Sequence, residues 1–183
     1  MPLKNELRKS LKKLRKSINN KNEADNMICK RLLELPEYKN AGLVLFYAAL
    51  DDEVNLDYCI ETALANGKKV ALPVCTDKDG NMKYYYINSF GDMVSGSFGI
   101  REPDTEKCVE VKDFSASLCV VPAISFDKRK YRLGYGKGYY DRFLKNYAYK
   151  SVGVCYNNLV VDELPADEYD IPVDIIITQD SVL

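Results

Sequence analysis

Leu43-Val44-Leu45-Phe46-Tyr47-Ala48-Ala49 is the stretch that most constrains the fold of this chain. Every position is apolar, whereas a strand with one face in water alternates apolar and polar residues, so we expect a strand buried on both faces. Such strands are typical of α/β domains, in which helices cover a largely parallel sheet. Further strands are predicted at Lys69–Val74, Met82–Ile87 (antiparallel), Leu118–Val121, Ser151–Tyr156 and Asp174–Thr178.

Helical patterns alternate with these strands. Leucine and isoleucine recur at helical spacing in the first 18 residues, which predicts an amphipathic helix with basic outer faces. Two further helices are expected at Glu23–Leu35, before a proline, and at Leu56–Asn66, before a glycine. Because no linker or internal repeat interrupts this pattern, we expect a single domain over residues 1–183.

The charge balance argues against large polyanionic partners. Lys plus Arg number 26 and Asp plus Glu 27, so the whole chain has no net field that would draw it to nucleic acid or to a membrane. Residues 1–22 are basic, with Glu6 as their one acid. A nucleic-acid or membrane role for this first helix is an alternative, but the overall charge disfavours it, and we expect neither partner.

Residue usage also limits the chemistry and the compartment. Histidine is absent, which excludes Ser-His-Asp triads and histidine-ligated zinc. The six cysteines are widely separated and mostly lie in apolar runs, as buried reduced thiols do. The first residues lack the apolar core of a secretory leader, and no stretch approaches membrane-spanning length. We therefore expect a cytoplasmic protein.

The run Arg132-Leu133-Gly134-Tyr135-Gly136-Lys137-Gly138-Tyr139-Tyr140-Asp141-Arg142-Phe143-Leu144 carries the strongest functional signal. Its three alternate glycines permit positive φ and close approach of the backbone. Arg132, Lys137 and Arg142 place three positive charges around this flexible turn. Together they predict a cradle for an anion, and a phosphate is the expected guest.

A helix is predicted to begin at Gly138 or Tyr139, so that its unpaired amides would point back into the same turn. Asp141, one turn into that helix, is suited to holding a Mg²⁺ that the phosphates share. The run is neither a Walker A loop nor a dinucleotide fingerprint, because its spacing fits neither pattern. The alternative is a glycine-rich surface turn with solvated charges.

Other charged residues are candidates for the same site. Lys4 and Arg8 lie at i and i+4 on one face of the first helix, although ordinary solvated charge explains them as well. Glu53 follows the first buried strand, where ligands of α/β folds gather, and its carboxylate could pair with an amino-pyrimidine ring. A simple acidic turn is the alternative for Glu53. Asp170 could join Asp141 at a metal.

Aromatic residues are abundant, and a flat heterocycle stacks favourably on aromatic faces. For each aromatic residue, the alternative is that its side chain is half-buried in a strand and serves only in packing. The loop Phe98-Gly99-Ile100-Arg101-Glu102-Pro103, bounded by glycine and proline, could cover a pocket. The candidates for walls around a ring are Tyr84, Tyr85, Tyr86, Phe98, Tyr139 and Tyr140.

Taken in order along the chain, these motifs resemble the 5-formyltetrahydrofolate cyclo-ligase family, also called 5,10-methenyltetrahydrofolate synthetases. The Arg-Leu-Gly-x-Gly-Lys-Gly-Tyr-Tyr-Asp core is the most specific part of the resemblance, which extends over essentially the whole chain. The resemblance implies a three-layer α/β/α sandwich with a largely parallel sheet, similar to the sugar-phosphate isomerase and CoA-transferase group. The residues that carry it are Lys4, Arg8, Glu53, Gly99-Ile100, Glu102-Pro103, Pro122, Phe126-Asp127, Arg132–Asp141, Leu164-Pro165 and Tyr169-Asp170.

The resemblance also implies ligands for these residues: ATP, Mg²⁺ and a reduced folate, with a monomer as the expected state. The implied metal ligands are Asp141 and Asp170. The implied ATP-binding residues are Lys4, Arg8, Arg132, Leu133, Gly134, Tyr135, Gly136, Lys137, Gly138, Tyr139 and Tyr140. The implied folate-binding residues are Leu50, Glu53, Phe98, Tyr135, Gly136, Lys137, Gly138 and Tyr139.

The implied reaction is the ATP-dependent closure of 5-formyltetrahydrofolate to 5,10-methenyltetrahydrofolate through a phosphorylated formyl group. Two positions depart from the family pattern, and a third is a conservative aromatic replacement. Leu159 stands where glutamine is common, Tyr169 where histidine often precedes the aspartate, and Phe98 where some members have tryptophan. Two alternatives remain: a non-catalytic nucleotide- or folate-binding protein on the same fold, and a sugar-phosphate isomerase, for which the phosphate-binding set is larger than needed.

Overall fold

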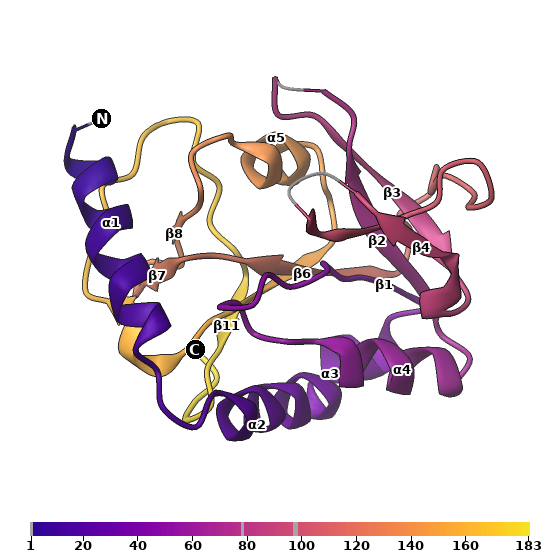
Figure 1. Ribbon diagram of the computed structural model, residues 1–183, viewed down its shortest axis with the longest axis horizontal. Helices are drawn as coiled ribbons and strands as arrows, with labels where there is room; N and C mark the ends of the chain where they lie inside the picture. The colour runs from indigo at the N-terminus through magenta and orange to yellow at the C-terminus, as the bar shows by residue number, and fades with distance from the viewer. Residues whose placement is uncertain (1, 78, 97–98) are drawn as a thin grey trace.

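A six-stranded sheet forms the centre of the computed structural model, which describes residues 2–77, 79–96 and 99–183 (Figure 1). Its strand order is β11-β9-β6-β1-β2-β3, and all neighbours are parallel except β2 and β3. This confirms the predicted α/β class and the antiparallel direction of Met82–Ile87. The strands are β1 (Leu43–Leu45), β2 (Lys69–Cys75), β3 (Met82–Ile87), β6 (Ser117–Pro122), β9 (Lys150–Val154) and β11 (Ile175–Ile177).

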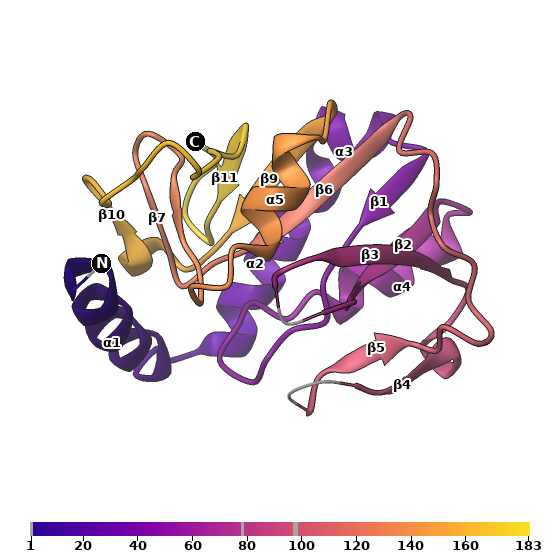
Figure 2. The same cartoon turned by 90° about the horizontal axis from the view of Figure 1, so that it is seen from above.

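Helices cover both faces of this sheet. In Figure 1, α2 (Lys21–Glu34), α3 (Pro36–Asn40) and α4 (Asp57–Ala65) lie on one side and α5 (Tyr139–Lys145) lies on the other. These three layers match the expected sandwich. The longest helix, α1 (Pro2–Lys16), lies apart from this stack, beside the small sheet that contains β7 and β10 (Figure 2).

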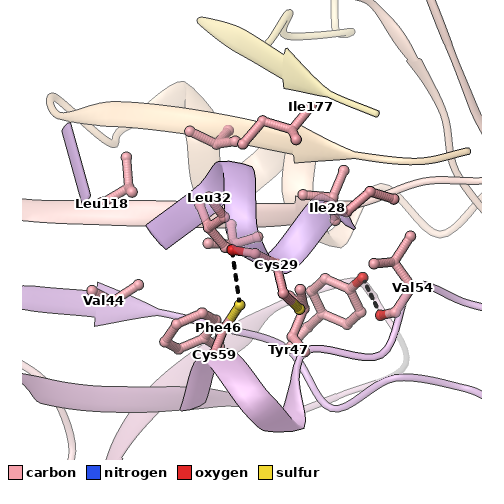
Figure 3. Close-up of a cluster of buried hydrophobic side chains, with 14 of the residues drawn as sticks. Ile28, Cys29, Leu32, Val44, Phe46, Tyr47, Val54, Cys59, Leu118 and Ile177 are labelled. Carbon is pink, nitrogen blue, oxygen red and sulfur yellow. Dashed lines mark hydrogen bonds between the residues drawn. The ribbon is translucent and has the colours of Figure 1, made fainter. Parts of the chain in front are cut away.

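The alternation of β1 side chains explains why its sequence is apolar throughout. Val44 and Phe46 pack in a cluster with Ile28 and Leu32 of α2 and with Cys59 of α4 (Figure 3). Their neighbours Leu43 and Leu45 belong to a second cluster, which includes Leu144 of α5. Both faces of the strand are therefore buried, as in other sheets covered on two sides.

Several elements differ from the predictions. β1 ends at Leu45 although Phe46 and Tyr47 are still buried, because apolarity reports burial and not the length of a strand ladder. α5 ends at Lys145, because the amides of Asn146 and Tyr147 donate to carbonyls only three residues back.

Short elements also occupy segments for which no regular structure was expected. α3 begins at Pro36. Proline is favoured at the first position of a helix, because the backbone N–H that it lacks would have no partner within the helix there. β4 (Met93–Ser95) and β5 (Arg101–Pro103) form a hairpin where a loop was expected, and 3₁₀ turns lie at Phe90–Asp92 and Asn157–Leu159. A three-stranded sheet consists of β7 (Ser125–Asp127), β8 (Arg132–Leu133) and β10 (Val160–Val161).

The six cysteines are all free thiols, four of them buried, as their apolar surroundings predicted. Within the described ranges, no helix is long and apolar enough to cross a membrane.

Candidate active site

The glycine-rich loop 134–138 connects β8 to α5 and adopts the backbone that its glycines were expected to allow. Gly136 has φ 99° and Gly138 has φ 73°, and Gly138 is the residue that immediately precedes α5. Side chains rarely tolerate this left-handed region. At Gly138 a Cβ atom would also lie 2.7 Å from Arg142 Nη1. The loop conformation therefore requires glycine for two independent reasons.

Arg142 lies between this loop and Gly80, which precedes β3. Its Nη1 donates a hydrogen bond to the Lys137 carbonyl at 2.7 Å, and a Cβ at Gly80 would lie 2.3 Å from the same nitrogen. The Tyr139 hydroxyl adds a second link by donating to the Asp77 carbonyl at 3.0 Å. Arg142 thus serves as a link within the protein, whereas Lys137 is exposed and, among the described residues, has no ion-pair partner.

The first helix reaches the same loop from the other side. Arg8 Nε donates to the Gly134 carbonyl at 2.8 Å, and the Arg8 guanidinium lies against Gly136, where a Cβ would be 3.3 Å from Cζ. Lys4, one turn earlier, does not reach the loop: its Nζ lies 2.6 Å from Asp170 Oδ2 and 2.9 Å from Asp167 Oδ2. Burial lowers the pKa of Lys4, but these two partners more than offset it, and the pKa is raised.

Both predicted metal ligands are paired with cations that were predicted to bind phosphate. Asp170 pairs with Lys4, and Asp141 pairs with Arg132, whose side chain is almost fully buried. The backbone of Ile171, next to Asp170, joins the two pairs: its amide donates to Asp141 Oδ1 at 3.1 Å and its carbonyl accepts from Arg132 Nη1 at 2.9 Å. The two carboxylates therefore flank one short segment.

This donor set fits Mg²⁺ only in part. The described residues contain no group of three or more His, Cys, Asp or Glu side chains that could hold a metal ion. Mg²⁺ is commonly bound by one or two carboxylates together with phosphate oxygens and water. Asp141 and Asp170 suit that arrangement, in which the phosphates of a nucleotide would complete the shell.

Glu53 is buried at the end of the loop that follows β1, and it meets the glycine-rich loop directly. Its Oε1 accepts a hydrogen bond from the Tyr135 hydroxyl at 2.8 Å, and its Oε2 accepts one from the Leu50 amide at 3.0 Å. Burial raises the pKa of Glu53, while those two hydrogen bonds and the nearby Arg15 offset part of the rise. Leu50, Glu53 and Tyr135 therefore form one cluster.

Arg15 belongs to this cluster and was missed in the sequence. Its side chain is 2% exposed, and it donates to the Tyr135 hydroxyl at 2.6 Å and to Asp52 Oδ1 at 2.9 Å. The available signal was its spacing, since Arg15 follows Leu11 by four residues and so lies on the apolar face of α1. A cation at a core-facing position is unusual, because charged side chains are seldom fully buried unless they are paired.

Some predicted contact residues have side chains that point elsewhere. Leu133 is buried in the main core, so only its backbone is available to a ligand. Tyr84 is fully buried, with its ring 4.9 Å from that of Phe143, and Tyr140 packs in the same cluster. Phe98 lies outside the described residues. Tyr84, Tyr86 and Tyr140 therefore contribute to core packing, as the alternative interpretation predicted.

The aromatic residues of that cluster border a groove of about 450 Å³. It runs between β3 and α5 and ends near the glycine-rich loop, where Gly80, Tyr139 and Arg142 contribute to its lining. The groove therefore reaches the start of α5, whereas the Glu53 cluster contacts the loop at Tyr135.

The chain is similar to known proteins over most of its length. The family model described as the 5-formyltetrahydrofolate cyclo-ligase family matches residues 1–179. A probable 5-formyltetrahydrofolate cyclo-ligase of Schizosaccharomyces pombe is 30% identical over 171 residues, covering 85% of this chain and 84% of that protein. The Escherichia coli K12 5-formyltetrahydrofolate cyclo-ligase is 29% identical over 156 residues, covering 83% and 86%.

A solved structure is similar over nearly the whole chain. The NMR structure of Aquifex aeolicus 5,10-methenyltetrahydrofolate synthetase aligns with a TM-score of 0.86 and 34% identity, covering 98% of this chain and 91% of that one. A Mycoplasma pneumoniae 5,10-methenyltetrahydrofolate synthetase, at 24% identity and a TM-score of 0.77, shares the fold. From the match over residues 1–179 and the agreement in fold, this chain belongs to the 5-formyltetrahydrofolate cyclo-ligase family.

Proposed function

We propose that this protein uses ATP to convert 5-formyltetrahydrofolate into 5,10-methenyltetrahydrofolate, with release of ADP and phosphate. The proposal rests on the hydrogen bond between Tyr135 and Glu53. Through it the glycine-rich loop, which is suited to phosphate, lies next to a buried carboxylate. One site can then hold both a nucleotide and a polar heterocycle. Family membership supports the same reaction.

The chemical problem is that an amide oxygen is a poor leaving group. In the proposed sequence the N5-formyl oxygen attacks the γ-phosphorus of ATP, the bond from that phosphorus to ADP breaks, and an iminium phosphate forms. N10 of the folate then bonds to the formyl carbon. Loss of the N10 proton and departure of the oxygen as phosphate leave the 5,10-methenyl bridge. Atoms and charge balance without a covalent intermediate on the protein.

The loop residues would bind and orient the triphosphate. Lys137 is exposed beside the loop amides, and Arg8 already contacts Gly134 and Gly136, so both can add positive charge at the transferred phosphate. Tyr139 and Tyr140 follow at the start of α5. Holding two substrates in reacting geometry is the main catalytic contribution expected of such a site.

Mg²⁺, when bound, would neutralise charge on the phosphates, and Asp141 and Asp170 are the residues proposed to hold it. Each of these carboxylates is paired with a cation that is proposed to bind phosphate, Asp141 with Arg132 and Asp170 with Lys4. Neighbouring groups would therefore hold the metal and the phosphates.

Glu53 would accept hydrogen bonds from the amino-pyrimidine part of the folate, because an ionised carboxylate can pair with two N–H donors at once. Leu50 and the loop residues Tyr135–Tyr139 would line the same folate site. We also propose that the protein works in the cytoplasm, which its six free thiols support. The monomeric state stays a prediction.

The proposed reaction is tested by incubating the purified protein with 5-formyltetrahydrofolate and Mg²⁺ and following the methenyl-folate absorbance band. We expect an increase that needs ATP. Absence of any increase in folded protein that binds ATP would refute the proposal and favour a binding protein.

A further inference from the structure

Arg15 is a buried cation whose contacts converge on the proposed folate site. From α1 its guanidinium reaches three separate segments: the Tyr135 hydroxyl at 2.6 Å, Asp52 Oδ1 at 2.9 Å and the Ala123 carbonyl at 3.2 Å. Glu53 Oε1 lies 3.9 Å from Nη1. The helix, the glycine-rich loop and the loop after β1 therefore share one side chain.

Packing alone does not explain an arginine at this position. The site lies on the apolar face of α1 beside Leu11, and a methionine or leucine would fill it without the cost of desolvating a charge. Moreover, Arg15 Nε is buried and has no hydrogen-bond partner among the described residues. A buried guanidinium with one unpaired donor is expensive, which points to a role other than stability.

The hydroxyl of Tyr135 is the atom through which Arg15 can act on Glu53. It accepts a hydrogen bond from Arg15 and donates its own proton to the Glu53 carboxylate, so that one chain runs from Arg15 through Tyr135 to Glu53. Burial and the neighbouring Glu53 raise the pKa of Tyr135, so the phenol remains a donor across the usual pH range. Lys12 Nζ, 4.4 Å from the ring centroid, also contacts the Tyr135 ring.

We propose that Arg15 is a positioning residue for folate binding, which fixes the Tyr135 hydroxyl and thereby holds the Glu53 carboxylate in its binding orientation. The inference rests on the proposed function, because it takes Glu53 as the folate anchor. Arg15 need not touch either substrate. Its effect should therefore appear in folate affinity and not in the use of ATP.

The test compares Arg15→Met with Arg15→Lys and with Arg31→Met as a matched control. Arg31 also ties a helix to a distant segment, through the carbonyls of Gln179 and Asp180, but lies away from this cluster. Folate affinity is measured by calorimetry with 5-formyltetrahydrofolate and no ATP, and KM values for both substrates are measured beside it. Thermal unfolding of each variant reports the structural effect.

We expect Arg15→Met to weaken folate affinity by about tenfold or more, the effect of losing one buried charged hydrogen bond, with the ATP KM changed less than about twofold. Arg15→Lys keeps the charge but not the forked geometry and should recover part of the affinity. Arg31→Met should lower the melting temperature and leave the folate affinity unchanged.

A pH profile separates positioning from a structural role. Among the described residues, the titratable and charged groups around Glu53 are Arg15, Asp52, Tyr135, Tyr47, Tyr140 and Tyr156. Arg15 lowers the pKa of Glu53, so Arg15→Met should raise it further. Because the ionised carboxylate binds folate, affinity of this variant should recover as the pH rises, while the wild type changes less over the same interval.

A double-mutant cycle with Tyr135→Phe tests whether Arg15 affects folate affinity through the Tyr135 hydroxyl. If Arg15 acts through that hydroxyl, the folate affinity of Arg15→Met/Tyr135→Phe should be close to that of Tyr135→Phe alone. Additive losses, or an unchanged folate affinity in Arg15→Met with only a lower melting temperature, would overturn the proposal. Should Arg15→Met fail to fold, Arg15→Lys and Tyr135→Phe give the same comparison. Folate binding without ATP-dependent turnover in the wild type would instead refute the proposed reaction alone.

Discussion

The Tyr135 hydroxyl lies 2.8 Å from Glu53 Oε1, and this hydrogen bond joins two segments separated by 82 positions in the sequence. It brings the glycine-rich loop and the loop after β1 together in one candidate site. The loop side presents Lys137 and Arg8, which suit a polyphosphate, and the other side presents a buried carboxylate, which suits the N–H groups of a heterocycle. The predictions below test the two halves separately.

Lys137→Ala should raise the ATP KM by about tenfold or more, since it removes an exposed charge that is free to bind phosphate. Folate affinity, measured without ATP, should persist. Lys145→Ala at the end of α5 is the control and should leave both constants unchanged. Unaltered ATP kinetics in Lys137→Ala would remove it from the nucleotide site.

Asp141→Asn should increase the Mg²⁺ concentration needed for half-maximal activity. The same change takes away the charge partner of buried Arg132 and should lower the melting temperature. Asp162→Asn, which disturbs only the exposed pair with Lys128, is the control. A normal metal titration in destabilised Asp141→Asn would show that the carboxylate has a structural role and does not bind the metal.

Glu53→Gln should weaken folate affinity more than ATP affinity and should remove a pH dependence. Burial raises the pKa of Glu53 above its ordinary value of 4.5, so in the wild type the ionised form is lost, and folate affinity with it, as the pH falls through that raised pKa. Calorimetry at several pH values checks the sign. A larger effect on ATP than on folate would contradict the assignment of Glu53.

Gly80→Ala should impair ATP binding from outside the glycine-rich loop. A Cβ at Gly80 would meet Arg142 Nη1 at 2.3 Å and the Lys137 carbonyl at 2.5 Å, which must displace the loop or the turn. Gly67→Ala is a matched control: it has positive φ as well, but nothing lies within 4 Å of its Cβ. In both variants alanine must adopt positive φ, which should lower the stability of the folded protein by about 1 kcal/mol. Only Gly80→Ala should raise the ATP KM.

The main sheet was predictable because strands buried on both faces have a continuous apolar sequence. Val44 and Phe46 face one layer of helices, and Leu43 and Leu45 face the other. The position of Glu53 after a buried parallel strand was predictable as well. Its contact with the glycine-rich loop was not, because that loop follows β8, which belongs to the separate three-stranded sheet. The hairpin at Met93–Pro103 was not, because its strands are short and half-exposed and give no clear alternation.

Pairings between distant charges could not be read from the sequence. Lys4 and Asp170 are 166 positions apart, and their ion pair depends on how α1 docks beside the small sheet. The same docking buries Arg15. Helical spacing identified the face of α1 that packs, but not the carboxylate and phenol that would meet it. The sequence signal for Arg15 was a basic residue on that packed face. It was hard to recognise because α1 contains many other basic residues.

Whether ring closure depends on ATP is decided by the methenyl-folate absorbance of purified wild-type protein with 5-formyltetrahydrofolate and Mg²⁺, measured with and without ATP. We expect an increase only when ATP is present, accompanied by an equal amount of ADP. An equal increase without ATP, or ADP formed with no methenyl product, would contradict the proposed reaction.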